Sequence, residues 1–237
     1  MHHQTTVATW TAVGITALPI YSILLVVGTL TPQPDQVADP EGWAQFVSTT
    51  HYMITHIATN LLGPILAILG AFALTVMMTA RSPRLAPTGM VLAVAGQVLF
   101  SVPAVISTFV TPAIGHAYLQ GDQDIMALTL PDAATMITVL ALMITVAGNI
   151  MLGTATAKST AVPRWSGIGW AAGTVTFYLL GAALGMATTG ASLLTQPIGA
   201  VLLTVSGAAM ARAAFHRRSR GDHQPAHDPI PTTDSRR

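Results

Sequence analysis

The sequence has few charged residues. Only 8% of its 237 residues are Asp, Glu, Lys or Arg, and 51% are hydrophobic, whereas a soluble domain carries about a quarter of its residues as charges. Lysine occurs once, at Lys158. A nucleic-acid-binding protein needs a dense face of Lys and Arg, which this composition excludes. We therefore expect a protein embedded in a lipid bilayer.

Cysteine is absent, which excludes disulfides, thiolate metal sites, iron–sulfur clusters and cysteine nucleophiles. Three catalytic signatures are missing as well: His-Glu-x-x-His, the phosphate-binding Gly-x-x-x-x-Gly-Lys and the nucleophile motif Gly-x-Ser-x-Gly. No carboxylate lies within the apolar runs, although ion-coupled transporters usually carry an ionisable residue at membrane depth. We expect a non-enzymatic protein without a cofactor, and coupling to an ion gradient is disfavoured.

Long apolar runs dominate the chain. A bilayer core of about 30 Å is crossed by a helix of roughly 17 to 25 apolar residues. Six nearly charge-free runs reach this length, at residues 8–30, 52–79, 85–111, 133–156, 166–188 and 193–215. We predict an all-α fold, with a six-helix transmembrane bundle over residues 1–215. Prolines inside the runs predict kinks, since membrane helices tolerate the lost hydrogen bond. They are Pro19, Pro64, Pro103 and Pro197.

The positive charges favour one orientation in the membrane. All ten Lys and Arg residues lie after the second or fourth run or from the end of the sixth run onward, and cytoplasmic loops are the ones that hold Lys and Arg. The connections after the first and third runs carry acids instead. We predict a plasma-membrane protein with both termini in the cytoplasm. Residues 216–237 lack apolar periodicity and are rich in polar residues, which predicts a disordered cytoplasmic tail.

The first long outer connection contains a helix-start pattern. Asp39 is suited to the N-cap and Pro40 to the first helical position. Trp43 and Val47 then share one face, which predicts a short amphipathic helix lying on the membrane surface. Residues 121–130, after the third run, show a weaker version of the pattern. Either these loops form a lid over a ligand, or they are ordinary interfacial loops with no ligand beneath them.

The second run has a polar arc and an aliphatic arc when its residues are placed about 100° apart. The polar arc comprises Tyr52, His56, Thr59, Asn60, Gly63, Ala67 and Gly70. Polar and small residues favour helix–helix contact, so we expect this arc to face the bundle interior. Gln97 and Asn149 lie on similar rows of the third and fourth runs. The candidate ligand-binding residues are Tyr52, His56, Asn60, Gln97 and Asn149. The structural alternative is that the three amides only form hydrogen bonds between helices.

His56 is the most informative of these residues, because an inward imidazole near the outer surface can bind a metal, move a proton or bond a ligand. With His51 and His116 it forms the candidate ligand set for an outer-facing metal. Positions 51 and 56 point about 140° apart on a regular helix. Both reach one ion only if the helix begins after His51. A bis-histidine haem is disfavoured, because only His56 lies clearly at membrane depth.

Four short motifs occur in order along the chain. They are Asp39-Pro40-Glu41, Leu62-Gly63 in the histidine-bearing second run, Pro112-Ala113-Ile114-Gly115, and Val162-Pro163-Arg164-Trp165-Ser166-Gly167. With these motifs, residues 8–214 resemble uncharacterised polytopic membrane proteins common in actinobacteria. The resemblance implies a multi-pass membrane protein and carries over no catalytic residue.

Together these features predict a multi-pass membrane protein with a binding or partner-interaction role and an outward-facing polar pocket. Its expected partners are the bilayer and either another membrane protein or a second copy of the chain, without nucleic acid. A transporter or channel for a small neutral solute is the alternative, since ion coupling lacks its usual residues. An outer-facing metal-binding protein is a further alternative.

Overall fold

The computed structural model describes residues 2–128, 131–189 and 192–221. Within these ranges the chain forms helices and no strand. Five of the helices are long and apolar enough to cross a membrane: Thr9–Thr29, Thr50–Met78, Leu85–Leu119, Asp132–Lys158 and Thr195–Arg217. The prediction of an all-α fold is confirmed, and the long apolar helices fit a membrane-embedded protein.

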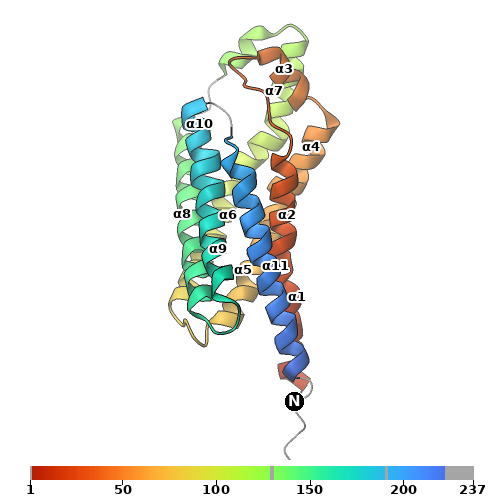
Figure 1. Cartoon of the computed structure of the whole chain (residues 1–237). Coiled ribbons are helices and arrows are strands. Elements are labelled where there is room, and N and C mark those ends of the chain that lie inside the picture. The colour runs from red at the N-terminus through yellow and green to blue at the C-terminus, as the bar shows by residue number, and fades with distance from the viewer. Residues whose placement is uncertain (1, 129–130, 190–191, 222–237) are drawn as a thin grey trace, which may run out of the picture.

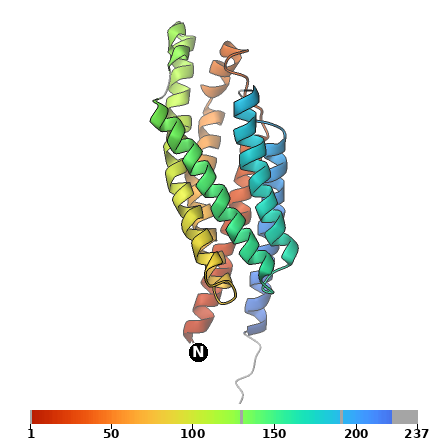
Figure 2. The same cartoon turned by 90° about the vertical axis from the view of Figure 1, so that its left-hand side faces the viewer.

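The helices stand side by side in an elongated bundle (Figures 1 and 2). The first two apolar runs form α1 (His2–Ile15), α2 (Ala17–Thr29), α4 (Thr50–His56), η1 (Ile57–Leu62) and α5 (Gly63–Met78), with α3 (Pro40–Val47) between them. The next two form α6 (Leu85–Val105), η2 (Ile106–Val110), α7 (Thr111–Leu119) and α8 (Asp132–Lys158), with η3 (Gln123–Ala127) after α7. The last two form α9 (Arg164–Thr174), η4 (Val175–Ala183), α10 (Leu184–Thr189) and α11 (Thr195–Gly221).

Two of the prolines affect the helices differently. The first run is interrupted at Thr16, between α1 and α2. Pro19 supplies the cause, because it has no N–H to donate to the carbonyl of Ile15. Pro197 lies in the first turn of α11, where the missing N–H would have no partner within the helix anyway. A proline at that position does not bend the helix, so the kink predicted there is wrong.

The apolar run at residues 166–188 is helical, as α9, η4 and α10, but it is not among the five long apolar helices. It packs between α8 and α11. Glycines permit this close approach: a Cβ on Gly167 would meet the backbone of Ala157 on α8, and a Cβ on Gly173 would meet Leu203 on α11. Small residues let helix backbones come together in this way. The segment is therefore an integral part of the bundle.

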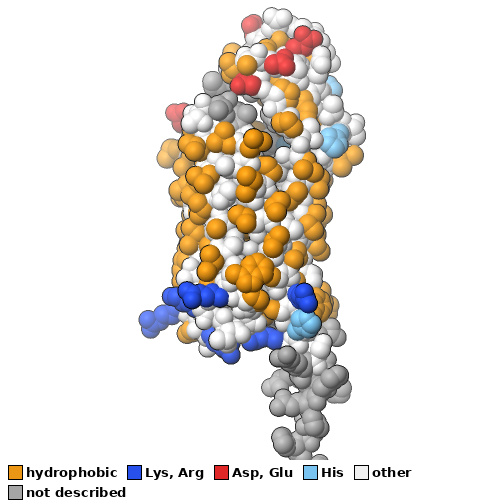
Figure 3. Space-filling model, in the orientation of Figure 1, with side chains coloured by type: hydrophobic (Ala, Val, Ile, Leu, Met, Phe, Trp, Pro, Cys, Tyr) orange, Lys and Arg blue, Asp and Glu red, His pale blue; other side chains and the backbone are white. Residues whose placement is uncertain are grey.

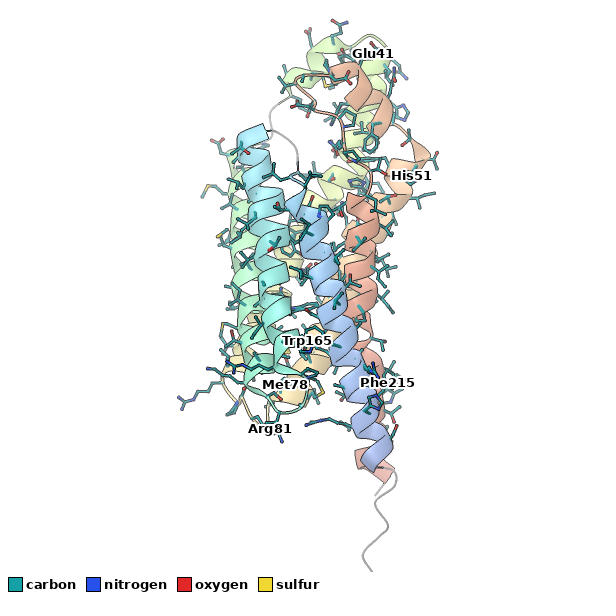
Figure 4. The ribbon with its side chains drawn as sticks, in the orientation of Figure 1. Glu41, His51, Met78, Arg81, Trp165 and Phe215 are labelled. Atoms are coloured by element: carbon teal, nitrogen blue, oxygen red, sulfur yellow. The ribbon has the colours of Figure 1, made fainter. Side chains whose placement is uncertain are left out.

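Charged side chains lie at the two ends of the bundle, with a broad hydrophobic band between them (Figure 3). Lys and Arg gather at the end where α1 begins, which we call the basic end. Asp and Glu gather at the opposite, acidic end. Figure 4 marks Glu41 at the acidic end and Arg81 at the basic end. The separation of charge predicted from the sequence is thus present in the fold.

A cap formed by α3, α7 and η3 extends beyond the bundle at the acidic end (Figure 1). The predicted start of α3 is confirmed, because the Asp39 carboxylate accepts a hydrogen bond from the Gly42 N–H at 2.9 Å and Pro40 is the first helical residue. The apolar face that was predicted to rest on the membrane surface packs against protein instead. Trp43 and Val47 are buried, and α3 packs against α7. Its apolar face is therefore already occupied by protein.

The cap extends the third run well past its predicted end at residue 111, since α7 continues to Leu119. Gly115 permits the contact with α3, because a Cβ there would meet Val47, Ser48 and the carbonyl of Ala44. The second helical pattern, predicted at residues 121–130, is only the short 3-10 helix η3. Residues 129–130 lie outside the described residues.

The last helix, α11, continues to Gly221, beyond the predicted boundary of the membrane domain at residue 215. Residues 216–221, which we expected in the disordered tail, are therefore helical. The remainder of the predicted tail, residues 222–237, lies outside the described residues.

Candidate functional site

A cavity of about 340 Å³ lies at the acidic end of the bundle, beneath the cap. Its size is within the range of about 300–1,000 Å³ that is usual for small-molecule pockets. The walls come from α2, α3, α4, η1, η4 and the start of α11, and from the loops before α3 and α11. Tyr52, His56 and Asn60 line it together. The polar arc predicted for the second run thus faces a cavity in the bundle.

Three helices of the bundle change from α-helical to π-helical hydrogen bonding, at η1, η2 and η4, and two of these segments, η1 and η4, line the cavity. Asn60 of η1 and Phe177 of η4 line the cavity. Pro64 follows η1 and cannot donate to the Asn60 carbonyl. Pro112 follows η2 and likewise cannot donate to the carbonyl of Thr108. The structure shows no equivalent cause for η4. π-Helical segments are rare and frequently mark functional sites.

Tyr52 and His56, one helical turn apart, have stacked rings with centroids 3.7 Å apart and planes inclined by 24°. The Tyr52 hydroxyl donates to the Ser107 carbonyl at 3.1 Å. His56 Nδ1 lies 3.0 Å from the carbonyl oxygen of Tyr52. Because a carbonyl only accepts, Nδ1 carries the hydrogen. In the neutral ring, Nε2 is then a hydrogen-bond acceptor that is available to a ligand.

Asn60 also has a fixed orientation. Its Nδ2 donates to the hydroxyl of Thr108 at 3.3 Å, while that hydroxyl donates to the Ala104 carbonyl at 2.7 Å. Asn60 Oδ1 lies 3.4 Å from the Thr59 hydroxyl, whose single hydrogen has a nearer acceptor in the Thr55 carbonyl at 2.9 Å. The amide oxygen of Asn60 therefore keeps most of its capacity to accept a hydrogen bond.

The described residues that line the cavity include no Asp, Glu, Lys or Arg. Uncharged amides enter from Gln36 and Gln196, and aromatic rings from Trp43, Phe46 and Phe177. Pockets of this type bury an apolar body and orient it through a few polar groups. The arrangement suits a small neutral molecule that donates a hydrogen bond.

The loop between α2 and α3 brings Gln36 to the cavity, and Asp35 shapes this loop. The Asp35 carboxylate accepts hydrogen bonds from the backbone N–H groups of Ala38 at 3.0 Å and Val37 at 2.7 Å. Both bonds favour the charged form and lower the pKa of Asp35. Asp35 does not itself line the cavity, so its role is to hold the loop.

Gln97 and Asn149 do not belong to this cavity. They line a separate interior void of about 10 Å³, which is the size of a single water. Asn149 Oδ1 accepts from Trp170 Nε1 at 3.0 Å, and its Nδ2 donates to the Thr145 carbonyl at 2.9 Å. Asn149 thus has partners on its own helix and on α9. The structural alternative, hydrogen bonding between helices, describes it better than ligand binding.

The three histidines considered as metal ligands are not brought together. His51 and His56 line the cavity, whereas His116 does not and is exposed on α7. Figure 4 shows His51 at the edge of the acidic end. In the part of the chain that the structure describes, no three His, Asp or Glu side chains are grouped closely enough to hold a metal ion. The geometry gives no support to the metal-binding alternative.

Several cavity residues could not be found from sequence periodicity. Gln36 lies in a loop, and Phe177 lies in a run whose polar and apolar residues define no clear face. Gln196 carried one usable signal, because it is a lone amide at the start of an apolar run.

A scan against protein-family models and searches of the curated proteins and of the solved structures found no match to this chain.

Proposed function

We propose that this chain is a non-enzymatic, multi-pass plasma-membrane protein that binds a small neutral molecule in the cavity beneath the cap. The ligand has a flat apolar body and at least one hydrogen-bond donor. The observation that carries the proposal is the uncharged cavity lined by Tyr52, His56 and Asn60, with π-helical segments in its walls.

In this proposal the bundle has six spans, with α9, η4 and α10 as the fifth. The charge distribution supports the orientation, because Lys and Arg concentrate on the cytoplasmic side of membrane proteins. The basic end is therefore cytoplasmic, both termini are cytoplasmic, and the cavity opens outward. An even number of spans is required to return the last helix to the side where α1 begins.

The donor requirement follows from the two acceptors. His56 Nε2 and Asn60 Oδ1 both accept, and a ligand without an N–H or O–H would leave them unpaired when it displaced water. An unsatisfied buried acceptor costs about 1–3 kcal/mol. A charged ligand is disfavoured for a different reason, since the described lining residues hold no opposite charge to compensate its desolvation.

A set of three matched probes tests the proposal: benzamide, N,N-dimethylbenzamide, which has no donor, and benzoate, which is charged. Trp43 lines the cavity, so its resonance in 5-fluorotryptophan-labelled protein, assigned with Trp43→Phe, reports occupancy. We expect benzamide to shift this resonance saturably and to bind about tenfold or more tightly than the other two, as loss of one hydrogen bond implies.

His56→Phe and Asn60→Leu should each weaken benzamide binding, whereas Gln97→Leu, in the separate void, should not. Equal affinity for the three probes, or no response of Trp43 to benzamide, would contradict the proposal. So would equal weakening by Gln97→Leu.

A transporter or channel for a neutral solute is the second candidate, and one observation favours it. The hydroxyls of Tyr21 and Tyr178 are hydrogen-bonded. Leu25 lines the cavity, and Tyr21, one turn closer to the start of α2, lines the interior void. This tyrosine pair therefore lies where a gate to the basic end would be needed. Glycerol flux into proteoliposomes, abolished by Asn60→Ala and increased by Tyr21→Ala, would favour transport over binding alone.

A further inference from the structure

We propose that a second hollow, between α8 and α9 at the basic end, is a binding site for one anionic phospholipid. The hollow has a volume of about 850 Å³ and a predominantly apolar lining that includes Ile150, Ala171 and Val175. It shares no lining residue with the cavity beneath the cap, although η4 contributes residues to both. The inference rests on membrane embedding and does not depend on a ligand in that cavity.

Two cations line this hollow, which we call the groove, at one end. Lys158 is the last residue of α8, and Arg164 is the first residue of α9. Both side chains line the groove and are exposed. The acids among the described residues, from Asp35 to Asp132, all belong to the connections at the opposite end. The two cations thus have no acidic neighbour in the described part of the chain. A phosphate diester supplies the missing negative charge.

The length of the groove matches one leaflet. From Arg164 to Val175 a helix rises roughly 16 Å at 1.5 Å per residue, and half of a bilayer core of about 30 Å is roughly 15 Å. Acyl chains can therefore extend along the apolar wall while the phosphate stays at the level of the two cations.

Trp165 gives an independent indication of that level. Its side chain is 52% exposed, and Figure 4 places it at the basic end. Exposed tryptophans of membrane proteins concentrate at the headgroup region. Because Trp165 directly follows Arg164, the cationic end of the groove lies at the depth of lipid phosphates.

Charge also argues against a second copy of the chain as the occupant. Two copies in one membrane share an orientation, so a two-fold contact through this groove would bring Lys158 and Arg164 of both copies to the same level. Four cations would then lie together without an acid from the described residues. Anionic lipid removes this repulsion, whereas self-association increases it.

Native mass spectrometry of the full-length protein in neutral detergent, titrated with phosphatidylglycerol or phosphatidylcholine, tests the site. We expect one tightly bound phosphatidylglycerol and no comparable phosphatidylcholine. The double variant Lys158→Gln/Arg164→Gln should lose roughly twenty-fivefold in affinity, at about fivefold for each cation. The matched control Arg84→Gln/Arg212→Gln removes two exposed cations from the same end that do not line the groove and should bind normally.

The variant Ala172→Trp separates the groove from simple charge attraction. Ala172 is an exposed lining residue, so its replacement fills the groove and should displace the lipid although both cations remain. Inorganic phosphate should not compete with the lipid. Equal binding of the two lipids, equal loss in the control variant, displacement by inorganic phosphate, or a dimer mass in place of the lipid adduct would overturn the proposal.

Discussion

At His56, a hydrogen bond within one helical turn decides which ring nitrogen is free. Nδ1 donates to the Tyr52 carbonyl, and the Tyr52 ring is stacked on the imidazole. We expect neutral His56 to carry its hydrogen on Nδ1, which is the less common tautomer of free histidine. Nitrogen NMR of ¹⁵N-histidine-labelled protein can identify it, with His56→Gln to assign the signal.

The exposed His51 has no ring contact of this kind in the structure and serves as the internal control. A signal from His56 showing hydrogen on Nε2 would remove the acceptor on which the ligand assignment depends.

Asp35 gives the loop over the cavity a pH dependence of known sign. Its pKa is lowered in the fold by the N–H groups of Ala38 and Val37, so its contribution to stability is present above the pKa of an unfolded aspartate. That contribution is lost as the pH falls through the lower, folded pKa. We expect the amide resonances of Val37 and Ala38 to shift with a midpoint below the ordinary aspartate value.

Asp35→Asn should abolish this titration while keeping the fold of the helices. A midpoint at or above the ordinary value in the wild-type protein would show that the carboxylate does not hold the loop.

Among single residues, the sequence predicted some roles well and others poorly. Helical periodicity placed Tyr52, His56 and Asn60 on one arc, because their relative directions depend only on the helix that carries them. Gln97 and Asn149 were grouped with them wrongly. Periodicity indicates which side of a helix faces inward, but it does not give the depth at which two helices meet.

Among the elements, α3 shows what can be predicted from neighbouring residues and what cannot. Asp39 and Pro40 predicted its start, since capping is determined by neighbouring residues. Its partner could not be predicted, because the contact with α7 depends on Gly115, distant in sequence. The extension of the third run to Leu119 was not predicted, for a related reason. Hydropathy falls near Thr111, but packing against α3 sustains the helix.

Gly115 therefore provides a test of the cap. We expect Gly115→Val to separate α3 from α7, at a cost of about 1–3 kcal/mol for an overpacked contact, and to expose Trp43. The fluorine resonance of Trp43 should then broaden or shift and become more sensitive to a soluble quencher. Ala113→Leu, on the exposed side of α7, is the control. An unchanged Trp43 signal in Gly115→Val would show that the cap does not depend on this contact.

At the level of the whole molecule, low charge and long apolar runs were sufficient to predict the fold class. The hydrophobic effect is non-directional and depends on the amount of apolar surface, so composition alone is enough to predict the fold class. The cavity was not predictable in the same way. It forms beside the π-helical segment that precedes Pro64 and beneath the cap, and this arrangement arises only when the elements assemble.

The central claim is that a neutral, water-accessible cavity reaches Asn60 from the outer side of the membrane. Because the natural chain has no cysteine, single cysteines test this directly in intact cells. We predict that Asn60→Cys reacts with a small, membrane-impermeant thiosulfonate added outside, while Ile65→Cys, on the lipid-facing arc, does not, and Lys158→Cys reacts only after the membrane is opened. Protection of Asn60→Cys from the external reagent, or labelling of Lys158→Cys from outside, would contradict the account.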